Sequence, residues 1–124
     1  MSLLLDTHVL LWWLGGEAIE PSVLARIADP ENHVVVSTVS VWEASIKEAI
    51  GKLAVPEPLG EAALSDGFAP LAVTFEHAEQ VFHLPPHHRD PFDRLLIAQA
   101  QVEGLTIVTR DPAFDLYDVP LIRC

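Results

Sequence analysis

The sequence predicts an α/β protein, a three-layer α/β/α sandwich around a mostly parallel central sheet of about four to five strands. Short apolar segments, such as residues 3–5 and 34–36, alternate with longer segments of helical periodicity. Strands that are apolar throughout are buried on both faces, which is typical of a parallel sheet covered by helices. The chain has 124 residues, half of them hydrophobic, enough for one core, so we expect residues 1–124 to form a single domain.

Glycine, proline and capping residues mark where the expected elements begin and end. Pro21 and Pro30 bracket a short helix, Gly51 stops a longer one, and Asp90-Pro91 opens a helix that ends at Gly104. The expected helices cover residues 9–14, 22–29, 38–50, 61–66, 75–81 and 91–103. The expected strands cover residues 3–5, 34–36, 71–73, 105–108 and 119–122, with a turn or short helix after Asp111.

Composition excludes several classes of protein. No apolar run approaches the roughly 20 residues needed to cross a bilayer. Asp6 interrupts the first apolar run, and the N-terminus lacks the pattern of a secretory signal, so we expect a cytoplasmic protein. The only cysteine, Cys124, has no partner for an intramolecular disulfide. The fold therefore has to rest on packing.

The net charge of −11, from 18 acidic and 7 basic residues, opposes the surface of a typical high-affinity nucleic-acid binder. This objection weakens if several acids share a divalent cation. Arg89, Arg94 and Arg110 also lie beside acids in the sequence. A basic protein partner is another way to balance such a surface.

Four acids fall where strands are expected to end and helices to begin. Asp6 ends the first strand, Glu43 lies in the first turns of the helix after the second, Asp93 is in the first turn of a long helix, and Asp111 follows the fourth strand. In an open parallel sheet, ligands bind outside the carboxyl ends of the strands. The four carboxylates are therefore expected to share one crevice.

Each of these acids also has a purely structural explanation, because acids suit helix N-termini. Ser40-Val41-Trp42-Glu43 matches a capping box, and Asp90 is placed to cap the helix that Pro91 begins. For any one acid taken alone, capping is the better explanation. The conjunction of four acids is harder to explain in this way.

Four carboxylates in one crevice would raise one another's pKa values and destabilise the fold unless a hard cation lay among them. Mg²⁺ or Mn²⁺ fits an all-oxygen site, whereas zinc prefers nitrogen or sulfur ligands. The chemistry that needs such a site is phosphodiester cleavage, in which cations activate water and stabilise the leaving oxygen.

Four segments, in this order along nearly the whole chain, resemble a PIN domain. They are residues 4–7 (Leu-Leu-Asp-Thr), 37–43 after a valine-rich strand, 93–100 (Asp-Arg-Leu-Leu-Ile-Ala-Gln-Ala) and 104–111 (Gly-Leu-Thr-Ile-Val-Thr-Arg-Asp). Within that family the chain is most similar to the VapC-type toxins of VapBC toxin–antitoxin systems. The resemblance implies a Mg²⁺- or Mn²⁺-dependent endoribonuclease that is usually a homodimer and is held inactive by a VapB-like antitoxin.

The resemblance also assigns roles to individual residues. Asp6, Glu43, Asp93 and Asp111 match the metal-binding acids of the family, the last being its most variable member. Asp90 is an additional acid that either binds metal through water or caps its helix, and we favour the cap. Thr7 and Thr109 either donate hydrogen bonds to metal-bound water or serve as turn residues. Arg94 and Arg110 either contact RNA phosphates or form surface ion pairs.

Histidines and tryptophans near these motifs are given less weight. His8, His87 and His88 suggest a metal or general-base role but lack the spacing of a chelating helix motif. The three tryptophans, Trp12, Trp13 and Trp42, are expected in the core or at a dimer or antitoxin groove rather than stacked on bases. The high apolar fraction also favours a second copy or an antitoxin segment as a cover for exposed apolar surface.

Two other functional classes remain open. An aspartate-nucleophile phosphatase shares the Leu-Leu-Asp-Thr start, but it needs a second aspartate where this chain has His8 and a lysine where it has Thr109-Arg110. A non-catalytic α/β interaction module would not need all four acids. The sequence leaves open which RNA is cleaved and whether one or two ions bind.

Overall fold

The computed structural model describes residues 1–16 and 18–124, and it contains one sheet of five parallel strands in the order β3-β2-β1-β4-β5. The strands are β1 (Ser2–Leu5), β2 (His33–Ser37), β3 (Ala69–Leu71), β4 (Thr106–Thr109) and β5 (Leu121–Arg123). In the registers of the central strand, Leu4 lies beside Val35 of β2 and Ile107 of β4. The predicted parallel sheet of four to five strands is confirmed.

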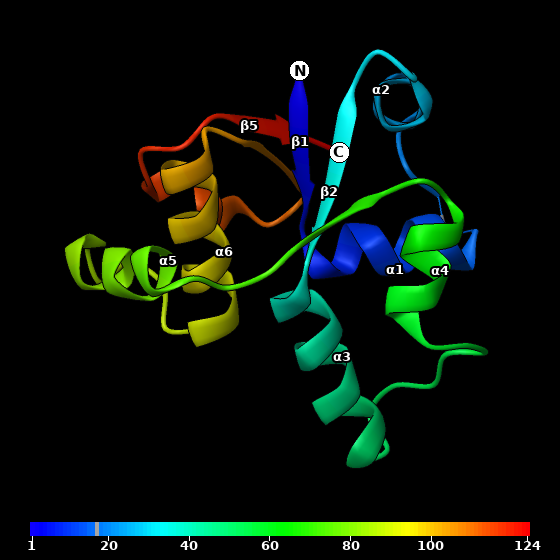
Figure 1. The fold of residues 1–124 in the computed structure, drawn as a ribbon, viewed down its shortest axis with the longest axis horizontal. Helices are drawn as coiled ribbons and strands as arrows, with labels where there is room; N and C mark the ends of the chain where they lie inside the picture. Colours follow the sequence, from blue (N-terminus) through cyan, green and yellow to red (C-terminus); the bar gives the residue numbers. More distant parts are fainter. Residues whose placement is uncertain (17) are drawn as a thin grey trace.

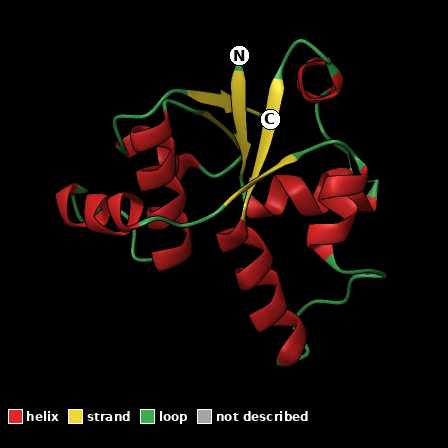
Figure 2. Ribbon diagram, viewed as in Figure 1, coloured by secondary structure: helices red, strands yellow, loops and turns green. Residues whose placement is uncertain are grey.

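Helices cover both faces of this sheet, as the ribbon views show (Figures 1 and 2). They are α1 (Thr7–Gly15), α2 (Pro21–Ala28), α3 (Thr38–Ala49), α4 (Leu59–Ser65), α5 (Phe75–Gln80) and α6 (Pro91–Glu103), with 3₁₀ turns η1 (Val81–His83) and η2 (Pro112–Leu116). Within the described residues, no helix has the length and apolar character to cross a membrane.

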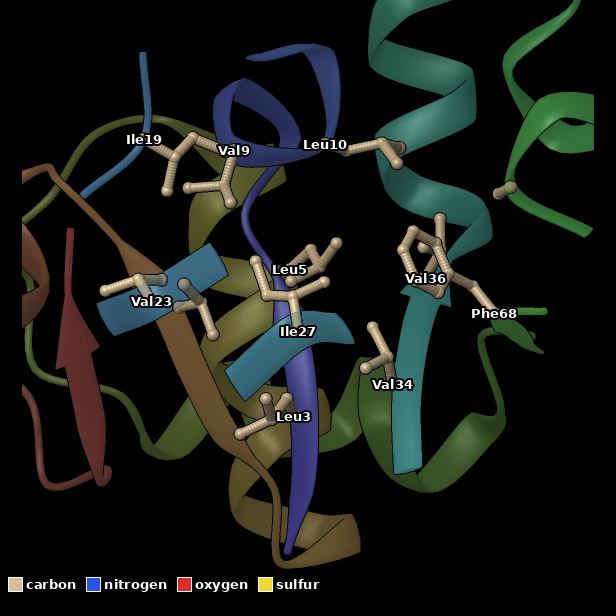
Figure 3. Close-up of a cluster of buried hydrophobic side chains, with 12 residues drawn as sticks. Leu3, Leu5, Val9, Leu10, Ile19, Val23, Ile27, Val34, Val36 and Phe68 are labelled. Carbon is tan, nitrogen blue, oxygen red and sulfur yellow. The ribbon is translucent and has the colours of Figure 1, made fainter. Parts of the chain in front are cut away.

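Alternating side chains of the central strand feed two separate cores. Leu3 and Leu5 pack with side chains from α1, α2 and α4 (Figure 3), whereas Leu4 packs on the opposite face with α3, α6 and η2. All three leucines are fully buried. Because successive side chains of a strand point to opposite faces, a strand between two helical layers has to be apolar at every position.

The third strand is the one element whose predicted position is clearly wrong. It was expected at residues 71–73, but it covers Ala69–Leu71 and includes Pro70. Proline lacks the N–H that a ladder needs, so it is rare inside central strands. Here β3 is an edge strand that pairs only with β2, and an edge tolerates proline.

Shortening a fully buried side chain of the central strand should destabilise the whole fold. Leu4→Ala is expected to lower the free energy of unfolding by about 2–5 kcal/mol, because it removes buried apolar surface and leaves a cavity. Leu116→Ala, at a residue that is 57% exposed, is the matched control and should change stability little. Urea unfolding followed by circular dichroism measures both, and equal losses in the two variants would contradict this account of the core.

Candidate metal centre

The four predicted acids come from the carboxyl ends of β1, β2 and β4 and the first turn of α6. Asp6 follows β1 directly, Glu43 lies on α3 after β2, and Asp111 follows β4 and begins η2. Asp6, Glu43 and Asp93 are almost completely buried, with exposed fractions of 3, 2 and 9%. Asp111 is partly exposed. Because the strands are parallel, these ends lie along one edge of the sheet.

His88 joins two of these acids at the rim of the site. Its Nε2 lies 2.8 Å from Asp93 Oδ2 and 3.8 Å from Asp111 Oδ2. One ligand atom from each of these three residues lies within 4.8 Å of the other two, close enough to hold a metal ion. Sequence spacing alone does not single out His88, because a histidine pair on adjacent residues is not a chelating motif. The path of the loop before α6 places His88 beside Asp93 and Asp111.

In Asp6 and in Glu43, one carboxylate oxygen contacts a neighbouring side chain, and the other has no partner among the residues that the structure describes. Thr109 donates a hydrogen bond of 2.8 Å to Asp6 Oδ2, and Lys47 Nζ lies 2.7 Å from Glu43 Oε2. Asp6 Oδ1 and Glu43 Oε1 are buried and have no hydrogen-bond partner among the described residues. Buried acceptors without partners are rare and destabilising. Free carboxylate oxygens of this kind are the ligands that Mg²⁺ and Mn²⁺ prefer, so the donor set fits such a cation.

The pKa values of the acids show the electrostatic cost of this arrangement. Burial, followed by the charges of Asp6 and Asp90, raises the pKa of Asp93 to about 7, although the contact with His88 lowers it. Burial also raises the pKa of Asp6, with the charge of Glu43 as a smaller contribution in the same direction. Asp6 is therefore close enough to interact electrostatically with both Glu43 and Asp93.

Capping explains some of the acids but not Glu43. Asp90 caps α6 as we favoured, because its Oδ1 accepts hydrogen bonds from the backbone N–H of Phe92 and of Asp93, at 2.8 and 3.4 Å. The capping box predicted for residues 40–43 is wrong: α3 begins at Thr38, and Ser37 is its cap. Asp111 both caps η2 and lies beside His88.

The two threonines have different contacts. The Thr7 hydroxyl donates a hydrogen bond of 2.9 Å to Ser40 Oγ, which ties α1 to α3. Thr109 donates to Asp6 and accepts from the backbone N–H of Asp111 at 3.0 Å. Thr109 therefore orients an acid of the site directly, whereas Thr7 acts on the helix that carries Glu43.

Neither arginine proposed as a phosphate contact has its guanidinium free, and neither forms an ion pair with a described residue. Arg94 donates to the carbonyl of Pro85 at 2.9 Å and to Tyr117 Oη at 3.2 Å, with longer bonds to the carbonyls of Val81 and Leu84. It therefore holds the loop that carries His88.

Arg110 is held in a similar way. It donates to the carbonyls of Ala18 and Cys124, at 3.0 and 3.1 Å, and its guanidinium lies 4.1 Å from the centre of the Trp12 ring. These contacts replace the surface ion pairs considered from the sequence and give no support to a phosphate contact by either arginine.

The tryptophans divide between core and surface. Trp12 and Trp13 pack against the core on the α1 side, as expected. Trp42 is 58% exposed and contacts Phe92 edge to face, with ring centres 5.0 Å apart. It lines an apolar cavity of about 340 Å³ between α3 and α4, together with Val41, Leu64 and Phe68.

The raised pKa of Asp93 predicts how stability depends on pH in the absence of metal. Between the ordinary value of 3.8 and about 7, the folded protein binds this proton more tightly than the unfolded chain does. In EDTA the free energy of unfolding should therefore fall as pH rises through this window. Asp93→Asn should flatten that dependence and raise stability near pH 8 by up to about 4 kcal/mol.

Denaturant unfolding at several pH values tests this prediction, with Asp118→Asn, at an exposed acid, as the control. Stability that rises with pH in the wild-type protein, or an Asp93→Asn variant that keeps the wild-type pH dependence, would contradict the assignment.

The fold of this chain recurs in solved structures of low sequence identity. One is VapBC2 from Rickettsia felis bound to a promoter DNA fragment, with a TM-score of 0.75, 13% identity and coverage of 99% of this chain and 98% of the other. FitAcB from Neisseria gonorrhoeae has a TM-score of 0.70 at 21% identity and coverage of 98% and 96%. VapBC-5 from Mycobacterium tuberculosis has a TM-score of 0.64 at 21% identity and coverage of 99% and 98%.

No curated protein matches the sequence. The sequence model of one family does match, over residues 3–120, which include all four acids, β2, β3, β4 and all of β1 except Ser2, and which end just before β5. This match argues against the phosphatase alternative, and it agrees with the acid-rich edge of the sheet described above. The chain belongs to the PIN domain family.

Proposed function

We propose that this protein is a Mg²⁺- or Mn²⁺-dependent endoribonuclease that uses the edge formed by Asp6, Glu43, Asp93 and Asp111. One observation carries the proposal: Asp6 Oδ1 and Glu43 Oε1 are buried and have no hydrogen-bond partner in the part of the chain that the structure describes, and burial also raises the pKa values of Asp6 and Asp93. A protein that used these acids only as helix caps would not leave such oxygens unbonded.

The residues of the site have distinct roles in this proposal. Asp6, Glu43 and Asp93 would hold the cation, with Asp111 and His88 at the more exposed side. When bound, a divalent cation supplies activation of water and stabilisation of the leaving oxygen of the phosphodiester. Thr109 holds Asp6 through one oxygen and so leaves the other free.

Proton release should accompany loading of the site. With a pKa of about 7, Asp93 is protonated in a large fraction of the metal-free molecules near neutral pH. A carboxylate ligand must be deprotonated, so cation binding displaces this proton and becomes tighter as pH rises. Asp90 caps α6, and its role as an additional metal ligand through water stays a prediction.

We further propose that the protein is the toxin of a VapBC-type system, acts as a homodimer and is inhibited by a VapB-like antitoxin. Support comes from the family and from the fold shared with VapBC structures. The apolar cavity beside Trp42 and Leu64, both 58% exposed, offers a surface for an apolar antitoxin segment.

Purified protein should cleave RNA only when Mn²⁺ or Mg²⁺ is present. EDTA should abolish cleavage, and Asp6→Asn and Asp93→Asn should each reduce its rate by at least about 100-fold, because each removes a cation ligand. Glu48→Gln, an exposed acid on the same helix as Glu43, is the matched control and should cleave at the wild-type rate.

Gel analysis of mixed cellular RNA tests the nuclease activity, and isothermal titration of Mn²⁺ tests cation binding separately. Metal-dependent cleavage that persists in both aspartate variants would assign the activity to another site or to a contaminant. Mn²⁺ binding without cleavage of any RNA would support a non-catalytic interaction module instead.

Expression in a bacterial host should slow growth if the protein is a toxin, and Asp6→Asn should remove the effect. Light scattering should show a dimer at micromolar concentration. Unimpaired growth with abundant folded protein would contradict the toxin role, and a monomer throughout that range would contradict the homodimer.

A further inference from the structure

An RNA strand that approaches this site meets several carboxylates in a protein of net charge −11. A cationic side chain beside the metal centre would therefore favour the approach of its phosphates. The sequence pointed to Arg94 and Arg110, but carbonyl oxygens occupy both guanidinium groups. A different cation should therefore perform this role.

Lys47 lies where such a contact is needed. It is one turn after Glu43 on α3, and its ammonium lies 2.7 Å from Glu43 Oε2. The Lys47 side chain is 39% exposed, whereas that of Glu43 is 3% exposed. The ammonium therefore lies at the boundary between the buried acids and solvent.

Only one hydrogen bond of the Lys47 ammonium lies within the described residues, so further N–H donors are available to a ligand. A lysine ammonium carries three N–H groups, and Glu43 is its one hydrogen-bond partner within the described residues. The pKa of Lys47 is raised chiefly by Glu43, and the charges of Asp90 and Asp93 add to the effect. A lysine is ordinarily charged at neutral pH, and the 2.7 Å contact with Glu43 places this ammonium beside the acids that we assign to the cation.

We propose that Lys47 binds a phosphate group of the RNA beside the metal centre, an inference that rests on the proposed ribonuclease function. The ammonium offers its free N–H donors to the phosphate oxygens while it stays within reach of Glu43. A lysine recognises phosphate as a compact point charge and needs no fixed fork geometry, which suits a flexible single strand.

A simpler explanation is that Lys47 only pairs with Glu43, because a pair four residues apart on a helix is common and weakly stabilising. The two explanations differ in how RNA affinity depends on salt. A lysine that contacts a phosphate releases counterions when RNA binds, so its loss reduces the slope of log K against log salt by about 0.7 for a single strand. A lysine that only orients Glu43 leaves this slope unchanged.

The test measures binding of a fluorescein-labelled single-stranded RNA of mixed sequence by anisotropy, in Ca²⁺ at several salt concentrations, with gels to show that the RNA stays intact. Lys47→Met should weaken binding about tenfold or more, because it removes a charged hydrogen bond, and should lower the salt slope. Lys47→Arg, which keeps the charge, should restore most of the affinity and the slope.

Two other cations serve as comparisons. Arg26 lies on α2, which leads into the amino end of β2, so Arg26→Met removes the same charge away from the acids and should change affinity little. Arg89 is exposed in the loop before α6, and its side chain forms no hydrogen bond or ion pair with any residue that the structure describes. Arg89→Met therefore tests whether this loop holds the phosphate instead.

The outcomes separate this inference from the proposed function. If wild-type protein cleaves RNA while Lys47→Met keeps the wild-type affinity and salt slope, this inference is wrong and the nuclease assignment stands. Equal losses in the Lys47 and Arg26 variants would likewise overturn it, because they would indicate only net charge. Failure of the wild-type protein to bind or cleave RNA would overturn both.

Discussion

The repulsion between carboxylates at one edge of the sheet is the constraint that shapes this molecule. A parallel sheet brings the ends of β1, β2 and β4 together, and here those ends deliver Asp6, Glu43 and Asp111 to one place. Neighbouring side chains offset this repulsion at each acid. Thr109 bonds one acid, Lys47 pairs with another, and His88 lies between Asp93 and Asp111. Asp6 Oδ1 and Glu43 Oε1 have no hydrogen-bond partner among the described residues, and a bound cation would give each of them a partner.

Patterns of apolar residues were sufficient to predict the layers of the fold. Wholly apolar segments marked β1 and β2 as buried strands, and Asp90-Pro91 marked the start of α6 correctly. The prediction failed where the sheet ends, at β3, because an edge strand needs fewer backbone hydrogen bonds and so can include Pro70. It failed again at α3, where Ser37 and not Ser40 supplies the cap. Helix ends depend on one hydrogen bond, and several nearby residues can form it.

The position of the four candidate acids at the carboxyl ends of strands or in the first turn of α6 could be predicted from the sequence, but the residues that contact them could not. The position of an acid at the end of a buried strand can be predicted, because the topology of a parallel sheet determines where that end lies. His88 and Lys47 reach the site through the path of a loop and the rotation of a helix, which local patterns do not encode. The arginines show the converse: Arg94 and Arg110 lie beside acids in the sequence, yet their guanidinium groups hold backbone carbonyls elsewhere.

The wide spacing of the acids along the chain has a consequence for folding. The pairing of β1 with β4 sets Leu4 beside Ile107, so the central strand acquires its second neighbour only after most of the chain has been synthesised. Contacts between residues so far apart in sequence form slowly, because they close a long loop. A nascent chain that has reached only α3 contains Asp6 and Glu43 but lacks Asp93 and Asp111. The candidate site therefore assembles late, and a ribosome-bound fragment of this protein that ended at α3 would carry only two of its four acids.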